Sequence, residues 1–143
     1  MKIILDVDTT PRAARNICDT IAQQFGLSLV SVSDIDRDAG DPRERTDRIL
    51  AALTRNDIVV TDDYTLADRI YEHAMAAVSP KGFVFTAANM DELLYERYLK
   101  NKKAAEAPTP APSKRGLARR ARAEERAFTS LMLDLISPVS KEL

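Results

Sequence analysis

The segment that decides the fold runs from Asp57 to Ala67 and reads Asp-Ile-Val-Val-Thr-Asp-Asp-Tyr-Thr-Leu-Ala. Its β-branched centre predicts a short buried strand, after which Leu66 and Ile70 recur at the spacing of a helix. The same order occurs at the start of the chain, where the apolar run 2–7 precedes a helical pattern that Gly26 closes. Strands that alternate with helices predict a parallel sheet covered by helices on both faces, because each parallel connection needs a crossover.

Further short apolar runs and helical patterns continue this alternation. We expect additional strands at residues 27–32, 76–78 and 83–85, and additional helices at residues 44–55 and 90–99. The stretch 33–43 is acidic and contains Gly40 and Pro42, which indicates a loop.

The chain divides into three parts. Residues 1–100 form the expected three-layer α/β domain, residues 101–116 a flexible, basic, Pro/Ala-rich connector, and residues 117–143 a C-terminal amphipathic helix and tail. An apolar stripe runs from Phe128 to Ile136 in the last part. We expect this stripe to dock on the core of its own chain, and a second subunit is the alternative.

Charge is unevenly distributed, although the net charge is only -1. Residues 1–99 hold 11 Lys/Arg against 17 Asp/Glu, whereas residues 100–126 hold 9 against 3. Such a basic segment favours contact with nucleic acid, and a simply solvated stretch of charge is the alternative.

The composition excludes several classes of protein. The 143 residues include one cysteine, Cys18, and one histidine, His73, which excludes an internal disulfide and a zinc module. No stretch approaches the roughly 20 apolar residues of a membrane-spanning helix, and the apolar run Ile3–Leu5 is too short for a signal peptide. We therefore expect a cytoplasmic protein with no membrane contact.

Aspartates follow two of the predicted strands. Asp6 and Asp8 end the first strand, and Asp62 and Asp63 end the strand at 57–61. Ligands of open parallel sheets bind beyond the carboxyl ends of the strands, so these side chains share one site if the two strands are neighbours. Two carboxylates about 4 Å apart repel by roughly 4 kcal/mol, and Mg²⁺ or Mn²⁺ would offset that repulsion. Helix capping by the same aspartates is the alternative.

Two other motifs match less well. Asp34–Asp38 imitates the start of an EF-hand loop, but Ala39 and Arg45 stand where calcium sites need glycine and glutamate. Asp6–Thr10 fits the nucleophile motif of haloacid-dehalogenase-type phosphatases. Those enzymes need a lysine before the later acid pair, and the chain has none between residues 2 and 81.

Three motifs together resemble the YaiI/YqxD family. They are Ile4-Leu5-Asp6-Val7-Asp8-Thr9-Thr10-Pro11, the segment Asp57–Ala67, and the turn Ser79-Pro80-Lys81-Gly82. The family pairs an Asp-x-Asp-x-x-Pro strand end with an Asp-hydrophobic-Val-x-Thr-x-Asp-x-x-Leu-Ala segment and an Asn-Pro-Arg-Gly turn, in this order and spacing. The resemblance implies a PIN-like (Rossmann-like) α/β domain, a nuclease-related fold whose active members hold Mg²⁺ or Mn²⁺ with several acids and cut RNA.

Carried over by position, the resemblance also implies site residues. The implied catalytic acids and metal ligands are Asp6, Asp8, Asp47 and Asp63, and Asp62 is added as a candidate metal ligand because of its position at the strand end. Thr61 and Lys81 are implied substrate contacts, with Lys81 acting on phosphate as a point charge.

The resulting functional hypothesis is a divalent-metal-dependent nuclease, a hydrolase of phosphodiester bonds in RNA or single-stranded nucleic acid. The basic segment 100–126 would draw in the phosphate backbone. The alternative is a PIN-like module that binds nucleic acid or protein without cleaving it. A homo-oligomer is compatible with both hypotheses.

Overall fold

The computed structural model describes residues 1–106 and 113–141, and five strands form one sheet in it. The strands are β1 (Lys2–Leu5), β2 (Ser28–Ser31), β3 (Ile58–Val60), β4 (Ala76–Ser79) and β5 (Phe83–Val84). They lie in the order β2-β1-β3-β4-β5, and the first four are parallel. β5 is antiparallel to β4, because the turn between them is too short for a crossover. The sheet is therefore mostly parallel, as the sequence predicts, with one antiparallel strand at its edge.

Six helices and two short 3-10 turns complete the chain as described. They are η1 (Val7–Thr9), α1 (Arg12–Phe25), α2 (Val32–Ile35), α3 (Pro42–Ala52), α4 (Tyr64–Ile70), η2 (Tyr71–His73), α5 (Ala87–Glu106) and α6 (Lys114–Lys141). α2 begins within the predicted strand 27–32 and runs into the stretch expected to be a loop. None of the described helices is both long and apolar enough to cross a membrane.

The predicted extended connector is helical at both of its ends. Residues 101–106 continue α5, and residues 114–116 begin α6. The reason is local composition, since lysine, alanine and glutamate are good helix formers and residues 101–106 contain no proline or glycine. The alternating prolines, Pro108, Pro110 and Pro112, lie outside the described residues.

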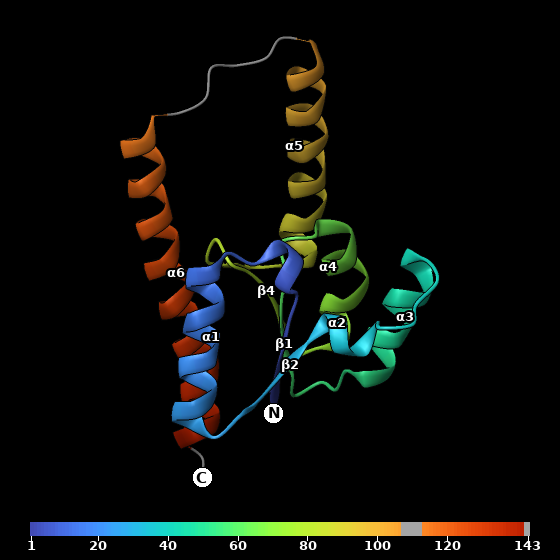
Figure 1. Cartoon of the computed structure of the whole chain (residues 1–143), viewed down its shortest axis with the longest axis vertical. Coiled ribbons are helices and arrows are strands. Elements are labelled where there is room, and N and C mark those ends of the chain that lie inside the picture. Colours follow the sequence, from blue (N-terminus) through green and yellow to red (C-terminus); the bar gives the residue numbers. More distant parts are fainter. Residues whose placement is uncertain (107–112, 142–143) are drawn as a thin grey trace.

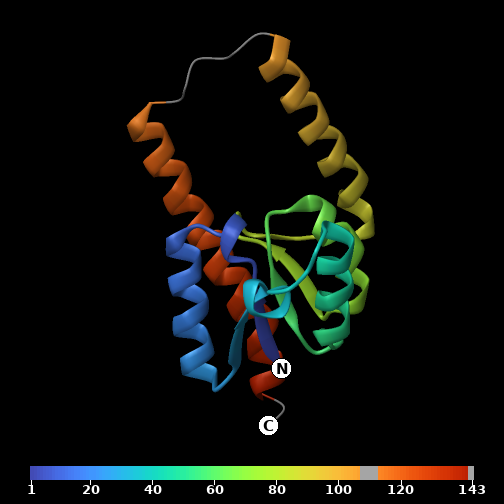
Figure 2. The same cartoon turned by 45° about the vertical axis from the view of Figure 1, so that its right-hand side comes forward.

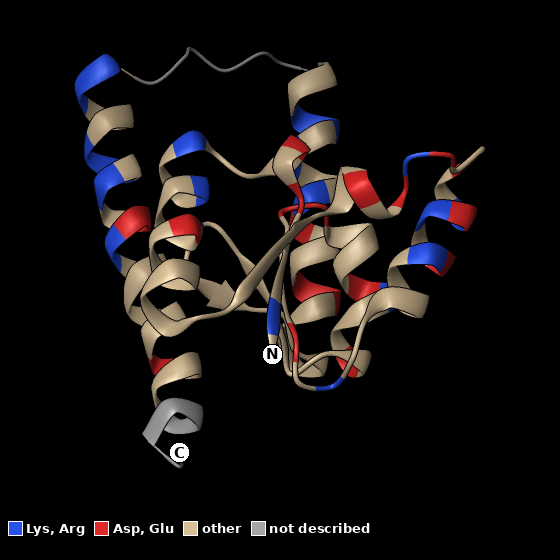
Figure 3. Ribbon diagram, turned by 60° about the horizontal axis from the view of Figure 1, so that its bottom comes forward, with Lys and Arg blue, Asp and Glu red and all other residues tan. Residues whose placement is uncertain are grey.

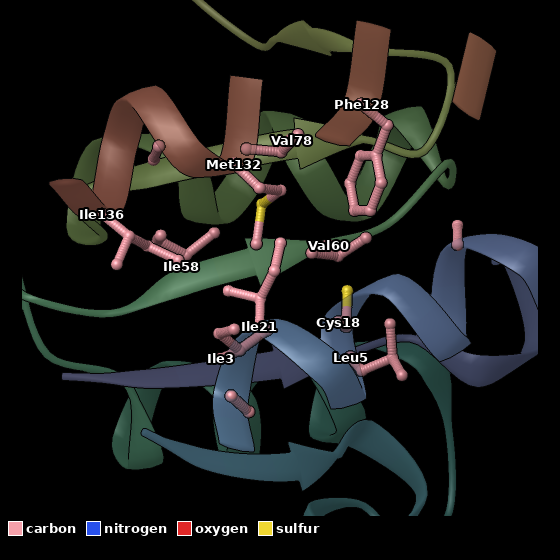
Figure 4. Close-up of a cluster of buried hydrophobic side chains, with 13 residues drawn as sticks. Ile3, Leu5, Cys18, Ile21, Ile58, Val60, Val78, Phe128, Met132 and Ile136 are labelled. Carbon is pink, nitrogen blue, oxygen red and sulfur yellow. The ribbon is translucent and has the colours of Figure 1, made fainter. Parts of the chain in front are cut away.

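One face of the sheet is covered by α1 and α6 (Figure 1). Phe128, Met132 and Ile136 of α6 are buried in this layer. Figure 4 shows them over the strands that carry Val60 and Val78. The predicted docking of the C-terminal stripe on the chain's own core is confirmed.

α1 contributes a second set of side chains to the same layer, including Cys18 and Ile21. Burial raises the pKa of the Cys18 thiol to about 12, so this cysteine is a protonated core residue. The helix ends at Gly26, whose φ of 66° lets the next amide, that of Leu27, donate to the Ala22 carbonyl at 2.8 Å.

The other face of the sheet is covered by α2 to α5. Ile4 and Val59 point to this face, opposite to their neighbours along each strand, and pack on Ile49 of α3 and Ile70 of α4. A smaller cluster next to it includes Met90 of α5. Helices on both faces make a three-layer α/β fold, as the sequence predicted.

A buried carboxylate fastens the amino edge of the sheet. Asp57 accepts hydrogen bonds from the backbone amide and the ammonium of Lys2, and from the amide of Thr54. Burial raises the pKa of the Asp57 carboxyl, but these hydrogen bonds outweigh that effect and hold it below its usual value. Asp57 therefore has a structural role at the edge opposite to the candidate site.

Candidate functional site

The order of the strands reverses between β1 and β3. The chain leaves β1 for β2 on one side, whereas β3 pairs with β1 on the other side. Asp6 directly follows β1, and its backbone amide donates to the Val60 carbonyl of β3 at 2.9 Å. Asp62 and Asp63 follow β3. β1 and β3 are neighbours, so Asp6, Asp62 and Asp63 follow adjacent strands at the switch point where open α/β sheets bind ligands.

Threonine hydroxyls link the ends of β1 and β3 around the Asp6 carboxylate. Thr61 Oγ1 donates to Asp6 Oδ2 at 2.7 Å, and Thr9 Oγ1 donates to the same oxygen at 2.9 Å. Thr61 Oγ1 also accepts a hydrogen bond from the backbone amide of Asp63 at 3.0 Å. Thr9 Oγ1 likewise accepts one from the backbone amide of Asp62 at 2.9 Å. Thr61, an implied substrate contact, is fully buried, so its hydroxyl orients Asp6 rather than facing solvent.

An arginine from α3 supplies positive charge to this network. The Asp6 side chain is 1% exposed, and Arg45 Nη2 lies 3.4 Å from its Oδ1. Arg45 Nε lies 2.6 Å from Asp36 Oδ2. This second contact is an ion pair without an aligned hydrogen bond, since the buried Nε has no hydrogen-bond partner. Arg45 therefore shares one positive charge between two aspartates.

The two aspartates after β3 have separate roles. Asp62 Oδ1 accepts a hydrogen bond from Ser79 Oγ of β4 at 2.9 Å, and its Oδ2 lies 3.6 Å from Lys81 Nζ. Asp63 is the N-cap of α4, and its Oδ1 accepts the amides of Thr65 and Leu66. The capping alternative thus holds for Asp63, while Asp62 forms part of an acid–base pair at the carboxyl edge.

Asp8 lies apart from this network. β1 ends at Leu5, and the chain then turns through η1. Asp8 is exposed on that turn, so Asp8 does not lie on one strand face with Asp6, as residues two apart on a continuous strand would. The turn is held by two threonine hydroxyls, since Thr9 donates to the side chain of Asp6 and Thr10 donates to its backbone carbonyl.

Asp47 also lies outside the network. α3 buries Thr46 and Ile49, which leaves Asp47 exposed on the outer face. Arg45 is the residue of this helix that reaches Asp6. The inward position of Arg45 can be read from the sequence, because Arg45 precedes the apolar Ile49 by four residues and residues at this spacing lie on one helix face.

The arranged side chains do not fit a metal centre as they stand. Asp6 and Asp62 accept hydroxyl hydrogen bonds, and Asp63 accepts backbone amides. Over residues 1–106 and 113–141, no three Asp, Glu, His or Cys side chains are grouped as metal ligands. Arg45 and Lys81 provide positive charge of the kind that the expected divalent cation would provide.

Fold and site together define a three-layer α/β protein with a cluster of acids, hydroxyls and cations at its switch point. The chain belongs to the YaiI/YqxD family, since the model of that family, described as uncharacterized, matches residues 4–137. The suspected resemblance is confirmed.

Curated relatives carry the name UPF0178 protein. One from Clostridium novyi is 32% identical over 113 residues, which cover 71% of this chain and 74% of the relative. One from Natranaerobius thermophilus is 30% identical over 110 residues, covering 69% and 74%. A third, from Ruminiclostridium cellulolyticum, is 27% identical and covers 99% of this chain and 95% of the relative. No solved structure matches the chain.

Proposed function

We propose that this protein binds single-stranded nucleic acid across the carboxyl edge of its sheet, with the phosphate backbone held by two basic arms. The arms are residues 97–105 of α5 and residues 114–126 of α6, which together contain ten Lys/Arg and two Asp/Glu. In two views the arms extend beyond the edge where β1 ends (Figures 1 and 2). This position of the arms beside the switch point is the observation that carries the proposal.

The charge on the arms favours an anionic partner. Residues 114–123 of α6 contain five Lys/Arg and no Asp/Glu, and all are exposed. Basic residues colour both arms in Figure 3. Cations in a first helical turn oppose the helix dipole, and a helix without packing partners is only marginally stable. A phosphate backbone along the arms would offset this accumulated positive charge.

Removing three arginines from the α6 arm tests the proposal. Binding through about five phosphates gives a slope near -3.5 for log affinity against log salt with single strands. The triple variant Arg119→Ala, Arg120→Ala and Arg122→Ala is expected to bind more weakly and to reduce the size of that slope by about 2. Fluorescence anisotropy of a labelled oligouridylate, measured over a range of salt, gives both quantities.

The matched control removes three exposed arginines away from the arms. The variant Arg43→Ala, Arg55→Ala and Arg69→Ala has the same net charge as the arm variant and is expected to keep the wild-type slope. The proposal is wrong if the wild type fails to bind the oligomer at low salt, or if both triple variants lose the same affinity.

A second candidate function is hydrolysis of phosphodiester bonds in the bound strand with Mg²⁺ or Mn²⁺. It is favoured by the position of Asp6, Asp62 and Asp63 directly after the neighbouring strands β1 and β3, and it requires a divalent cation to regroup carboxylates that do not form a metal centre as they stand. A divalent cation there would compete with Arg45 and Lys81 for the same carboxylates. Cleavage thus needs its own test beside the binding experiment.

The double variant Asp6→Asn and Asp63→Asn provides that test, because asparagine at position 63 still caps α4. Purified protein is incubated with RNA and manganese, and the fragments are separated on a gel. Wild type is expected to cut RNA and the double variant to leave it intact. The variant Asp68→Asn and Asp91→Asn, which changes exposed acids elsewhere, should cut like wild type. Equal loss or equal survival of RNA with wild type and double variant contradicts the hypothesis.

A further inference from the structure

A pocket of about 380 Å³ opens beside the carboxyl edge, between the start of α4 and the middle of α5. Its walls include Asp62, Tyr64, Lys81, Leu93, Arg97 and Lys100. Asp62 therefore belongs both to the switch-point network and to this pocket. The volume lies within the range of pockets that bind small organic groups, roughly 300–1,000 Å³.

The Tyr64 ring forms a fixed aromatic platform in the pocket. Its centroid lies 5.4 Å from that of Phe85 and 6.5 Å from that of Phe83, both in edge-to-face geometry. The guanidinium carbon of Arg97 lies 5.2 Å from the Tyr64 centroid. Aromatic rings and planar guanidinium groups are the surfaces on which unpaired bases stack.

Cations lie next to this platform. Lys81, Arg97 and Lys100 line the pocket together with two acids, Asp62 and Glu96. The Lys81 side chain is 47% exposed and only 3.6 Å from Asp62, so its ammonium has donors available for a second anion. A planar platform beside an excess of positive charge suits a ligand that is flat at one end and anionic at the other. A nucleotide has this chemistry.

We propose that this pocket holds one nucleotide of the bound strand, with its base stacked on the Arg97–Tyr64 pair and its phosphate on Lys81 and Lys100. The inference rests on the proposed function and adds a base-contacting subsite to it. The bound strand would then run over the surface between the arm on α5 and the switch point at Asp62.

Paired probes separate base stacking from backbone attraction. One is a fluorescein-labelled oligouridylate of about ten nucleotides, within the usual site size, and the other is the same backbone without bases. Arg97→Lys keeps the charge but loses the planar group. It is expected to weaken binding of the oligouridylate about ten-fold and to leave the abasic probe unchanged. Tyr64→Leu is expected to do the same, and Tyr95→Leu, a change at an exposed tyrosine outside the pocket, should alter neither.

The outcomes distinguish this inference from the proposed function. If the wild type binds neither probe, the proposed function and the subsite both fail. If it binds both probes and Arg97→Lys and Tyr64→Leu leave both affinities unchanged, the subsite alone is wrong. Uridine 5′-monophosphate is the third probe, and binding as tight as that of the oligomer would overturn the assignment to a strand. Arg97 is exposed, so its variant tests the subsite even if Tyr64→Leu fails to fold.

Discussion

Replacing Gly82 with alanine is expected to lower the free energy of unfolding by about 3 kcal/mol, because it adds a steric clash to a backbone that disfavours side chains. Gly82 has a φ of 100°. A Cβ atom there would lie 2.5 Å from the Ala127 Cβ and 2.9 Å from the backbone nitrogen of Phe128. Both residues belong to α6, so the turn after β4 sets how closely that helix docks. Urea unfolding followed by circular dichroism measures the change.

Gly26→Ala is the matched control for Gly82→Ala. Gly26 also has a positive φ, 66°, but a Cβ atom there would meet nothing within 4 Å. This variant therefore reports backbone strain alone, about 1–2 kcal/mol. The difference between the two variants isolates the clash with α6. Equal losses of stability would contradict the idea that close approach of this turn to α6 requires glycine.

The fold was predictable because its signals are local. The β-branched runs that end at Leu5 and Val60 have the composition of strands that are buried on both faces. Because helices alternate with these strands along the chain, the sequence also predicts a parallel sheet. The strand at residues 83–85 is confirmed as β5, but its antiparallel direction was not predicted, because the strand–helix alternation indicates only parallel connections. α5 continues past residue 99, where the sequence predicts its end, because residues 101–106 are mostly good helix formers.

The site was only partly predictable, because its decisive contacts join distant segments. Strand-end position sufficed to find Asp6 and Asp62. The positive charge that pairs with Asp6 comes from Arg45, 39 residues further along the chain. No local sequence pattern predicts a contact between these two residues. The contact of the Thr9 hydroxyl with Asp6 is equally hidden in the sequence, since helix capping and carboxylate binding use the same residue types.

Arg45→Met is expected to lower the free energy of unfolding by about 2 kcal/mol, because it leaves the Asp6 carboxylate buried without its counter-charge. Losing one partner of a fully buried pair costs about 3–5 kcal/mol. The effect here should be smaller, since the Arg45 side chain is 27% exposed and its contact with Asp6 is 3.4 Å long. Methionine preserves much of the apolar length of the side chain, so urea unfolding reports mainly the lost charge.

A double-mutant cycle decides whether that cost arises at Asp6. In an Asp6→Asn background the same Arg45→Met change should cost at least about 1 kcal/mol less, because the amide needs no counter-charge. Arg48→Met removes a more exposed pair with Glu44 and a hydrogen bond to the Asp38 carbonyl, should cost clearly less than Arg45→Met, and serves as the control. If Arg45→Met costs the same in both backgrounds, Arg45 stabilises α3 through Asp36 instead. The candidate site would then hold a buried acid without a dedicated cation, and the case for a divalent ion at Asp6 would become stronger.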